Sequence, residues 1–224
     1  MREISFPPVD SADPDGIVAV GGDFKIDMLM AAYSQGIFPW PISKKHPYVW
    51  FSPDPRGIIE LSDFHVPRSF KKFLKTCQFR VTYNTDFESV IRNCGKVKRK
   101  GQRTTWIVDE LEEAYIELFH HKLAYSVEVW NPNNELVGGL YGVSMGQFIS
   151  GESMFMKEDG ASKFALYSLC ELLKSKGIPF LDTQMVTSVV ELFGGKYIPR
   201  ESFIEKLKHL NWYQDRQEVF PLSI

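Results

Sequence analysis

The 224-residue sequence predicts a mixed α/β protein, in which a small N-terminal lobe precedes a larger domain built around one central mixed sheet. Pro and Gly divide the first 62 residues into short elements, whereas the elements that follow are long. The later part has the order strand, strand, strand, helix, strand, helix, which is typical of a mixed α/β domain. We therefore expect a lobe over residues 1–62 and a domain over residues 63–224.

The N-terminal lobe is expected to contain one short helix and one pair of strands. Apolar residues recur at helical spacing over 26–35, and Gly36 ends this pattern. The segment 49–61 predicts a strand, a turn and a second strand, because the SPDP in its middle consists of residues that turns favour.

The larger domain is expected to contain amphipathic helices that alternate with strands. Asp86 has a side chain suited to the N-cap of one helix, and Gly177 suits the C-terminal end of another. The expected helices cover residues 68–75, 86–94, 109–122, 161–177 and 199–210. The expected strands cover residues 79–84, 124–130, 135–146, 147–155 and 178–184.

Composition excludes several classes of protein. The net charge is −2, so any contact with nucleic acid must come from local basic patches. The N-terminal segment does not have the pattern of a signal peptide, and no apolar run is long enough to span a membrane. The three cysteines have no CxxC spacing and the five histidines form no ligand motif. The sequence therefore predicts a cytoplasmic protein with reduced thiols and no structural metal, and we expect a monomer.

Two carboxylates lie at the ends of the most apolar strands, where open α/β sheets bind ligands. Glu152 follows the third strand of a meander, and Asp182 ends a buried strand with Gln184 on the same strand face. A structural alternative is that the two acids cap nearby backbone N–H groups, or pair with Lys163 or Arg200. Because two acids flank one helix and an amide accompanies them, we favour a functional site.

Three further features have both a structural and a functional interpretation. Glycines in the strand 138–146 indicate either sheet curvature or close backbone approach. The start of the helix after 157–160 could bind an anion, although this signal is weak alone. Basic groups at 68–72 and 96–103, the latter followed by Trp106, suit RNA phosphates and an unstacked base, or are simply solvated with a tryptophan in the core.

A series of motifs now identifies a family. FPP, DGIVAVGGDF, AYSQGIFPW, WFSPDPRG, RSFKK, TWI, LVGGLYGVSMG, GESMF, ASKFAL and LDTQ follow one another in this order. From about residue 6 to residue 203 the chain thus resembles the leucyl/phenylalanyl-tRNA–protein transferase family. The resemblance implies a small N-terminal lobe and a domain of GNAT-like acyltransferase topology.

The resemblance also implies an activity. The family moves Leu or Phe, and Met less well, from aminoacyl-tRNA to the N-terminal Arg or Lys of a protein. The product is routed to ATP-dependent proteolysis through the N-degron pathway. No metal, nucleotide or coenzyme A is implied as a cofactor.

The resemblance implies catalytic roles for Asp182, Gln184 and Glu152. It implies that Trp106 stacks on the terminal adenine of the tRNA, with Trp50 and Phe51 near the same base. The basic residues expected to contact tRNA are Arg68, Lys71, Lys72 and Lys163. The apolar pocket for the aminoacyl side chain is expected to use Leu140, Ile149, Met154, Leu166, Leu173 and Leu181.

Three rival functions stay open at this point. A GNAT-like acyltransferase that uses coenzyme A would need a Gly-rich loop before the long helix, where this chain has only Gly160. A tRNA-binding module without catalysis would not need Asp182 and Gln184 together. A transferase of the same family with altered specificity is suggested by Met156, Val189 and Leu192, which depart from the usual family pattern.

Overall fold

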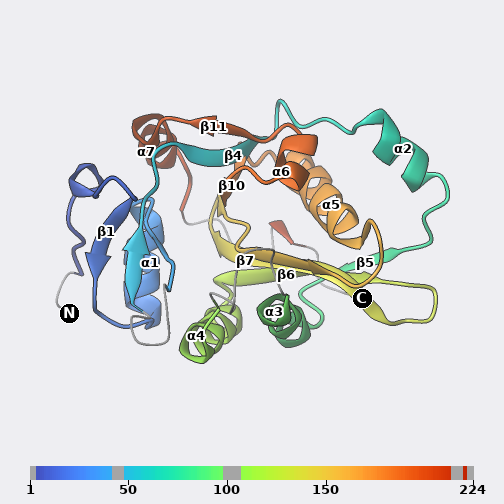
Figure 1. Ribbon diagram of the computed structural model, residues 1–224, viewed down its shortest axis with the longest axis horizontal. Helices are drawn as coiled ribbons and strands as arrows, with labels where there is room; N and C mark the ends of the chain where they lie inside the picture. Colours follow the sequence, from blue (N-terminus) through green and yellow to red (C-terminus); the bar gives the residue numbers. More distant parts are fainter. Residues whose placement is uncertain (1–3, 42–47, 98–106, 213–218, 221–224) are drawn as a thin grey trace.

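The computed structural model describes residues 4–41, 48–97, 107–212 and 219–220, and it confirms the predicted α/β class (Figure 1). Short elements of the N-terminal segment lie at one end of the molecule, and the longer elements form the rest (Figure 1). No helix in the described part of the chain is long and apolar enough to cross a membrane.

The N-terminal segment forms a small antiparallel sheet beside one helix. The strands lie in the order β1-β3-β2. The sequence predicts the helix and the third strand, whereas it does not predict the first two strands. These elements are η1 (Val9–Ser11), β1 (Ile17–Val20), α1 (Ile26–Ser34), β2 (Phe38–Pro39) and β3 (Val49–Phe51).

A second antiparallel sheet has β4 (Arg56–Glu60) at its centre, between β10 (Phe180–Gln184) and β11 (Lys196–Ile198). Four of the five β4 residues are buried, because strands flank it on both edges. This strand lies within residues 1–62, yet it pairs with the end of the chain rather than with the N-terminal strands. The sequence does not predict β11.

The largest sheet pairs its strands in the order β5-β6-β7-β8, and β9 also pairs with β7. The single strand expected over 147–155 is interrupted, because β8 and β9 pair with different parts of β7. Instead of one mixed sheet, the described strands form three antiparallel sheets, and a parallel bridge between Ser150 and Asp182 joins two of them. The strands are β5 (Arg80–Tyr83), β6 (Ala124–Trp130), β7 (Leu136–Met145), β8 (Phe148–Ile149) and β9 (Ser153–Met156).

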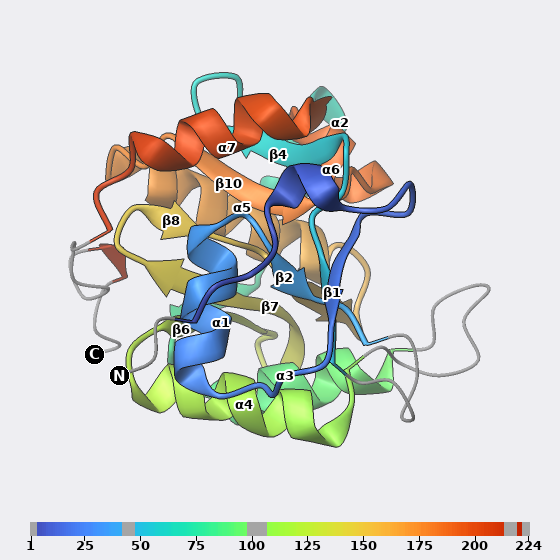
Figure 2. The same ribbon diagram turned by 90° about the vertical axis from the view of Figure 1, so that its left-hand side faces the viewer.

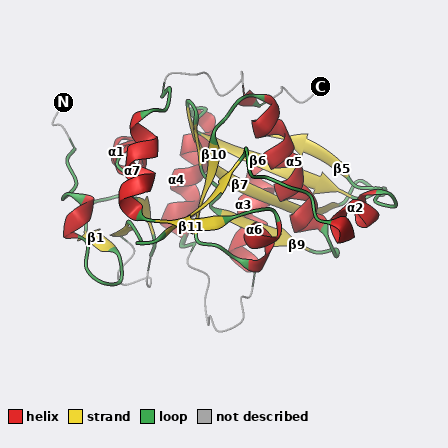
Figure 3. Ribbon diagram, turned by 90° about the horizontal axis from the view of Figure 1, so that it is seen from above, coloured by secondary structure: helices red, strands yellow, loops and turns green. Residues whose placement is uncertain are grey.

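Helices cover both faces of this largest sheet. α3 and α4 lie on one face and α5 on the other (Figure 1), and Figure 3 shows the same layers from above. The side chain of Asp86 accepts a hydrogen bond from the Ser89 N–H, which confirms the predicted N-cap of α3. The helices are α2 (Arg68–Leu74), α3 (Phe87–Lys96), α4 (Asp109–His120), α5 (Ala161–Ser175), α6 (Ser188–Leu192) and α7 (Arg200–Lys208).

The N-terminal segment shares its core with the rest of the molecule. One cluster of buried residues contains Leu29 and Phe38 of that segment together with Phe87, Leu111 and Phe203 of later helices. Figure 2 shows α1 above α4, and buried residues of both helices, Leu29 and Leu111, belong to this cluster. The position of the N-terminal segment relative to the larger sheet is therefore set by packed side chains.

Candidate active site

The site lies at the break between β8 and β9, beside the end of β10. Gly142 of β7 permits this break, because a Cβ at this position would lie 1.7 Å from the Ser150 carbonyl oxygen. This close approach is one of the two interpretations that the sequence leaves open for the glycines of the strand. The Gly151 N–H then donates to the Asp182 carbonyl at 2.8 Å, which joins the break to β10.

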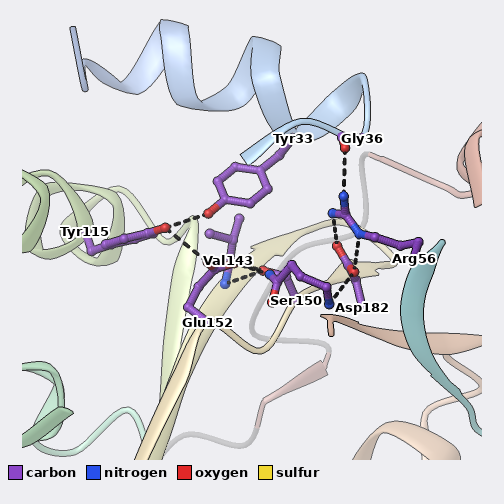
Figure 4. Close-up of polar contacts among 9 residues, drawn as sticks. Tyr33, Gly36, Arg56, Tyr115, Val143, Ser150, Glu152 and Asp182 are labelled. Atoms are coloured by element: carbon purple, nitrogen blue, oxygen red, sulfur yellow. Dashed lines mark hydrogen bonds and ion pairs between the residues drawn. The ribbon is translucent and has the colours of Figure 1, made fainter. Parts of the chain in front are cut away.

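Asp182 is fully buried and is held by Arg56. The Arg56 Nε donates to Oδ1 at 2.9 Å and Nη2 donates to Oδ2 at 2.7 Å (Figure 4). Such a bidentate pair satisfies a buried carboxylate far better than a single contact. The sequence suggested Lys163 or Arg200 as the partner of a structural carboxylate, but the partner of Asp182 is Arg56 of β4.

Gln184 has an unusual backbone conformation. Its φ is +55°, in the left-handed region that non-glycine residues rarely adopt. Its N–H donates to Asp182 Oδ1 at 3.1 Å, and its side-chain Nε2 donates to Glu152 Oε1 at 3.0 Å. The structure thus brings together the three predicted catalytic residues, and it leaves Gln184 Oε1 without a partner among the described residues.

Glu152 is partly buried and is surrounded by hydroxyl and amide donors. Ser150 Oγ donates to Oε1 at 2.6 Å, and the Tyr115 hydroxyl donates to Oε2 at 3.2 Å (Figure 4). Burial raises the pKa of Glu152 to about 7, and the nearby charge of Asp182 acts in the same direction, while the hydroxyl donors oppose it. Glu152 can therefore exchange a proton near neutral pH.

Two tyrosines extend this network to the N-terminal segment. The hydroxyls of Tyr33 and Tyr115 lie 2.6 Å apart. Burial raises the pKa of each tyrosine well above its usual value, and the charge of Glu152 raises it further. Both phenols therefore stay protonated and can donate to Glu152. The network connects α1, α4 and the break after β8 (Figure 4).

An apolar cavity of about 480 Å³ opens beside Gln184 and Glu152. Its size is that of a pocket for a small ligand. Asp182 does not line it. Within the described residues, no three His, Cys, Asp or Glu side chains gather as metal ligands would. The cavity is lined by Trp40, Leu140, Gly151, Glu152, Ser153, Met154, Leu166, Leu169, Leu181, Thr183, Gln184, Met185, Thr187, Val189 and Val190.

The cavity wall agrees only in part with the expected pocket. Leu140, Met154, Leu166 and Leu181 line it. Two other expected residues, Ile149 and Leu173, are fully buried in the core and do not line the cavity. Ile149 belongs to β8, which precedes the interruption between β8 and β9. Leu173 lies two turns beyond Leu166 on α5.

The residues expected to contact tRNA are spread over several elements. Trp106 lies outside the described residues. Trp50 is only 1% exposed, because its ring packs against Phe6 and Phe24, so stacking on a base would require its release from the core. Phe51 is partly exposed.

The basic residues expected to contact tRNA lie on two helices. Arg68, Lys71 and Lys72 are exposed on α2, and Lys163 is partly exposed near the start of α5. Gly160, just before α5, lies against the ring of Phe73 on α2, so the two helices are neighbours. These side chains therefore belong to one region of the molecule.

Four residues of the site could not be recognised from the sequence: Trp40, Arg56, Tyr33 and Tyr115. Trp40 lines the cavity and lies edge-on to Phe51, with ring centroids 6.4 Å apart. Its signal is present in the motif AYSQGIFPW, but the spacing does not indicate which aromatic residue faces the cavity. Tyr33 and Tyr115 occupy the apolar faces of predicted helices, where an aromatic ring reads as core.

Polar groups that converge at the rim of an open apolar cavity are typical of an enzyme that binds an apolar group in the cavity and reacts with it at the rim. Comparison with known proteins gives the family. Residues 58–208 match the family model described as leucyl/phenylalanyl-tRNA protein transferase, and residues 22–54 match the model for the N-terminal domain of that transferase. The chain belongs to the leucyl/phenylalanyl-tRNA–protein transferase family, which confirms the resemblance in its motifs.

Curated relatives agree with this assignment. A leucyl/phenylalanyl-tRNA–protein transferase from Flavobacterium johnsoniae is 44% identical over 93% of this chain and 97% of its own length. One from Pseudoalteromonas atlantica is 46% identical over 92% of this chain and 88% of its own length.

Solved structures are similar over a smaller part. L-PGS from Bacillus licheniformis is 13% identical with a TM-score of 0.45, over 82% of this chain and 62% of that chain. A dodecameric spermidine N-acetyltransferase from Vibrio cholerae is 16% identical with a TM-score of 0.31, over 45% of this chain and 64% of that chain.

Proposed function

We propose that this protein transfers Leu or Phe from aminoacyl-tRNA to the α-amine of a protein that begins with Arg or Lys. The observation that carries the proposal is Gln184 at the rim of the apolar cavity. Its Nε2 is engaged by Glu152, and its Oε1 is available to an incoming amine. The protein acts as a monomer, and its products enter proteolysis.

The reaction needs alignment more than a strong base. The donor is an activated ester, and an α-amine has a pKa of roughly 8, so a useful fraction is neutral at physiological pH. The amine nitrogen forms a bond to the ester carbonyl carbon, and the bond from that carbon to the ribose oxygen breaks. One amine proton leaves, and the ribose oxygen takes up a proton.

Gln184 and Glu152 contact the reacting groups in this proposal. Gln184 Oε1 accepts a hydrogen bond from the attacking amine and so aligns its lone pair with the carbonyl carbon. Glu152 lies next to Gln184 Nε2 and stabilises the positive charge that develops on the attacking nitrogen. Asp182 orients Gln184 and does not meet substrate, because it is fully buried and does not line the cavity.

The cavity receives the aminoacyl side chain. Its wall combines leucines with Met154 and Met185, and methionine adapts to side chains of different shape. Such a wall accepts both Leu and Phe, because one methylene changes binding by only about 1–3 kcal/mol. Polar donors should react poorly, since few polar groups in the cavity could satisfy them.

The acceptor end of the tRNA lies at the cavity mouth in this proposal. Trp40 offers the aromatic face nearest the cavity, and stacking of one base contributes about 1–3 kcal/mol. Lysines and Arg68 of α2, with Lys163, contact phosphates, so affinity should fall as salt rises. Trp106, expected to stack on the terminal adenine, is part of the same proposal.

Transfer of a labelled aminoacyl group tests the function. Radioactive Leu-tRNA is incubated with a peptide that begins with Arg, and a new peptide bond is measured with and without coenzyme A. Transfer without coenzyme A supports the proposal. A requirement for coenzyme A would indicate the rival acyltransferase, and binding of tRNA without transfer would indicate a binding module.

A substitution at Met154 tests the cavity. Met154→Phe adds bulk to the wall, so kcat/KM for the larger Phe donor should fall more than that for Leu. Met30→Phe, at a partly buried methionine of α1 outside the cavity, is the matched control. Equal losses for both donors in Met154→Phe would exclude this strand from donor selection.

A further inference from the structure

We propose that Arg56 and Gly57, adjacent residues of β4, are positioning residues that hold Gln184 in the geometry needed for transfer. The inference rests on the proposed role of Gln184 at the cavity rim. Neither residue lines the cavity, so both act through β10.

Arg56 is buried with all three guanidinium nitrogens engaged. Nε and Nη2 bind the carboxylate of Asp182, and Nη1 donates to the Gly36 carbonyl at 2.9 Å (Figure 4). The guanidinium carbon lies 4.7 Å from the ring centroid of Phe38 and 4.5 Å from that of Phe203. The side chain is 1% exposed. It therefore has one orientation, and the carboxylate that it binds has one orientation too.

Asp182 in turn fixes the direction of the Gln184 backbone N–H. Its Oδ1 accepts from Arg56 Nε and also from the backbone N–H of Gln184. The positive φ of Gln184 costs roughly 1–2 kcal/mol, so the conformation needs such a contact to persist. With Oδ1 fixed by Arg56, the Gln184 N–H is directed at one point, and its side chain leaves the strand toward Glu152.

Gly57 makes room for the same conformation. It pairs with Gln184 across the register shift between Asp182 and Gln184. A Cβ on Gly57 would lie 2.6 to 2.9 Å from the backbone atoms of Met185. The φ of Gly57 is not in the left-handed region, so the close approach of β10 is what requires glycine here. A larger residue would push Met185 away and turn Gln184 with it.

Arg56 also links Gln184, through Asp182, to the segment at the cavity mouth. The Gly36 carbonyl and the Phe38 ring that contact its guanidinium lie just before Trp40, which lines the cavity. One side chain thus sets the distance between Gln184 and the aromatic wall. Lysine carries the same charge, but its ammonium cannot make the planar contacts to Asp182 and Gly36 together.

Two substitutions with matched controls test the inference. Arg56→Lys and Gly57→Ala should each lower kcat on the order of 100-fold with little change in KM for aminoacyl-tRNA, because a small displacement of a reacting group costs about that much. Arg92→Lys, in an exposed ion pair with Glu88, and Gly95→Ala, where an added Cβ has only Glu112 nearby at 3.7 Å, should keep normal turnover.

A second measurement does not depend on activity. Hydrogen exchange of the Gln184 backbone amide, followed by NMR, should be slow in the unmodified protein and at least about tenfold faster in Arg56→Lys, because its partner Asp182 is then no longer held. If the unmodified protein transfers nothing while exchange changes as expected, the proposed function fails and the positioning stands. Normal turnover and unchanged exchange in both variants would overturn the inference. Loss of folding in both would also overturn it, because the pair would then serve the fold rather than Gln184.

Discussion

Asp182, which is fully buried, and Glu152, which is partly buried, are neighbouring carboxylates in opposite surroundings. Asp182 faces a guanidinium, and its pairing with Arg56 involves both carboxylate oxygens. Glu152 lies at the cavity wall and meets only neutral donors from Ser150, Tyr115 and Gln184. The first carboxylate has a permanent countercharge close by, whereas the second has none among its hydrogen-bond partners.

This difference separates two uses of a carboxylate within one site. A carboxylate in a bidentate ion pair keeps one geometry, so it can orient other groups. A carboxylate with neutral partners in a poorly solvated position gains or loses a proton easily, and its pKa of about 7 follows from that. We infer that Asp182 fixes the position of Gln184, whereas Glu152 carries a charge that changes with its protonation.

The largest effect should come from breaking the ion pair. Asp182→Ala leaves Arg56 buried without its partner, which costs roughly 3–5 kcal/mol of folding free energy. Urea unfolding measures this loss. Asp63→Ala removes an exposed partner of Lys196 and should change stability little, since exposed pairs are screened by water.

A double substitution sharpens the same comparison. Arg56→Met combined with Asp182→Leu removes both charges, so much of the stability should return. Turnover should not return, because Gln184 has lost the carboxylate that accepts its N–H. Recovery of turnover together with stability would contradict a positioning role for Asp182.

The second effect concerns Glu152 and pH. Its pKa rises from the ordinary 4.5 to about 7 on folding, so the folded protein binds more protons than the unfolded chain between these values. Glu152 therefore destabilises the fold increasingly as pH rises from about 4.5 to about 7. The total is at most roughly 3 kcal/mol, and less where water fills the cavity.

Glu152→Gln removes this pH dependence. The variant should gain stability relative to the unmodified protein across that pH range, and thermal melting at a series of pH values measures the gain. Glu117→Gln, at an exposed carboxylate of α4, should give a curve parallel to that of the unmodified protein. A constant difference for Glu152→Gln across the range would show that Glu152 has an ordinary pKa.

The sequence predicts Asp182, Gln184 and Glu152 as residues of the site because their signals are local. Asp182 and Gln184 share a strand face at a spacing of two, and Glu152 follows a glycine at a strand end. The partner of Asp182 could not be predicted, since Arg56 is 126 positions away in the chain. Its contact depends on the pairing of β4 with β10, and no periodicity in either segment specifies that pairing.

For aromatic residues too, the sequence does not show which of them face the cavity, because this depends on strand pairing. Trp40 directly follows β2 and its N–H donates to the Val49 carbonyl of β3, whereas Trp50 of β3 pairs with Pro39. Trp40 nevertheless lines the cavity, and Trp50 belongs to the core. Strand register decides this outcome, and both strands are too short for their alternation to indicate a buried face. The basic residues of α2 are easier to predict, because the exposed face of an amphipathic helix follows directly from its period.

The smallest effect should come from Tyr115→Phe, which removes one neutral donor from Glu152 and keeps the ring in the core. The lost hydrogen bond favours ionised Glu152, so its absence should raise the pKa of Glu152 further above 7. A contribution of about 1 kcal/mol corresponds to somewhat less than one pH unit. The inflection in the stability curve should therefore move to higher pH. Tyr83→Phe removes a hydroxyl that donates to the Ser168 carbonyl, away from Glu152, and should leave the inflection in place. An inflection that does not move in Tyr115→Phe would mean that the Tyr115 hydroxyl does not stabilise the ionised form of Glu152.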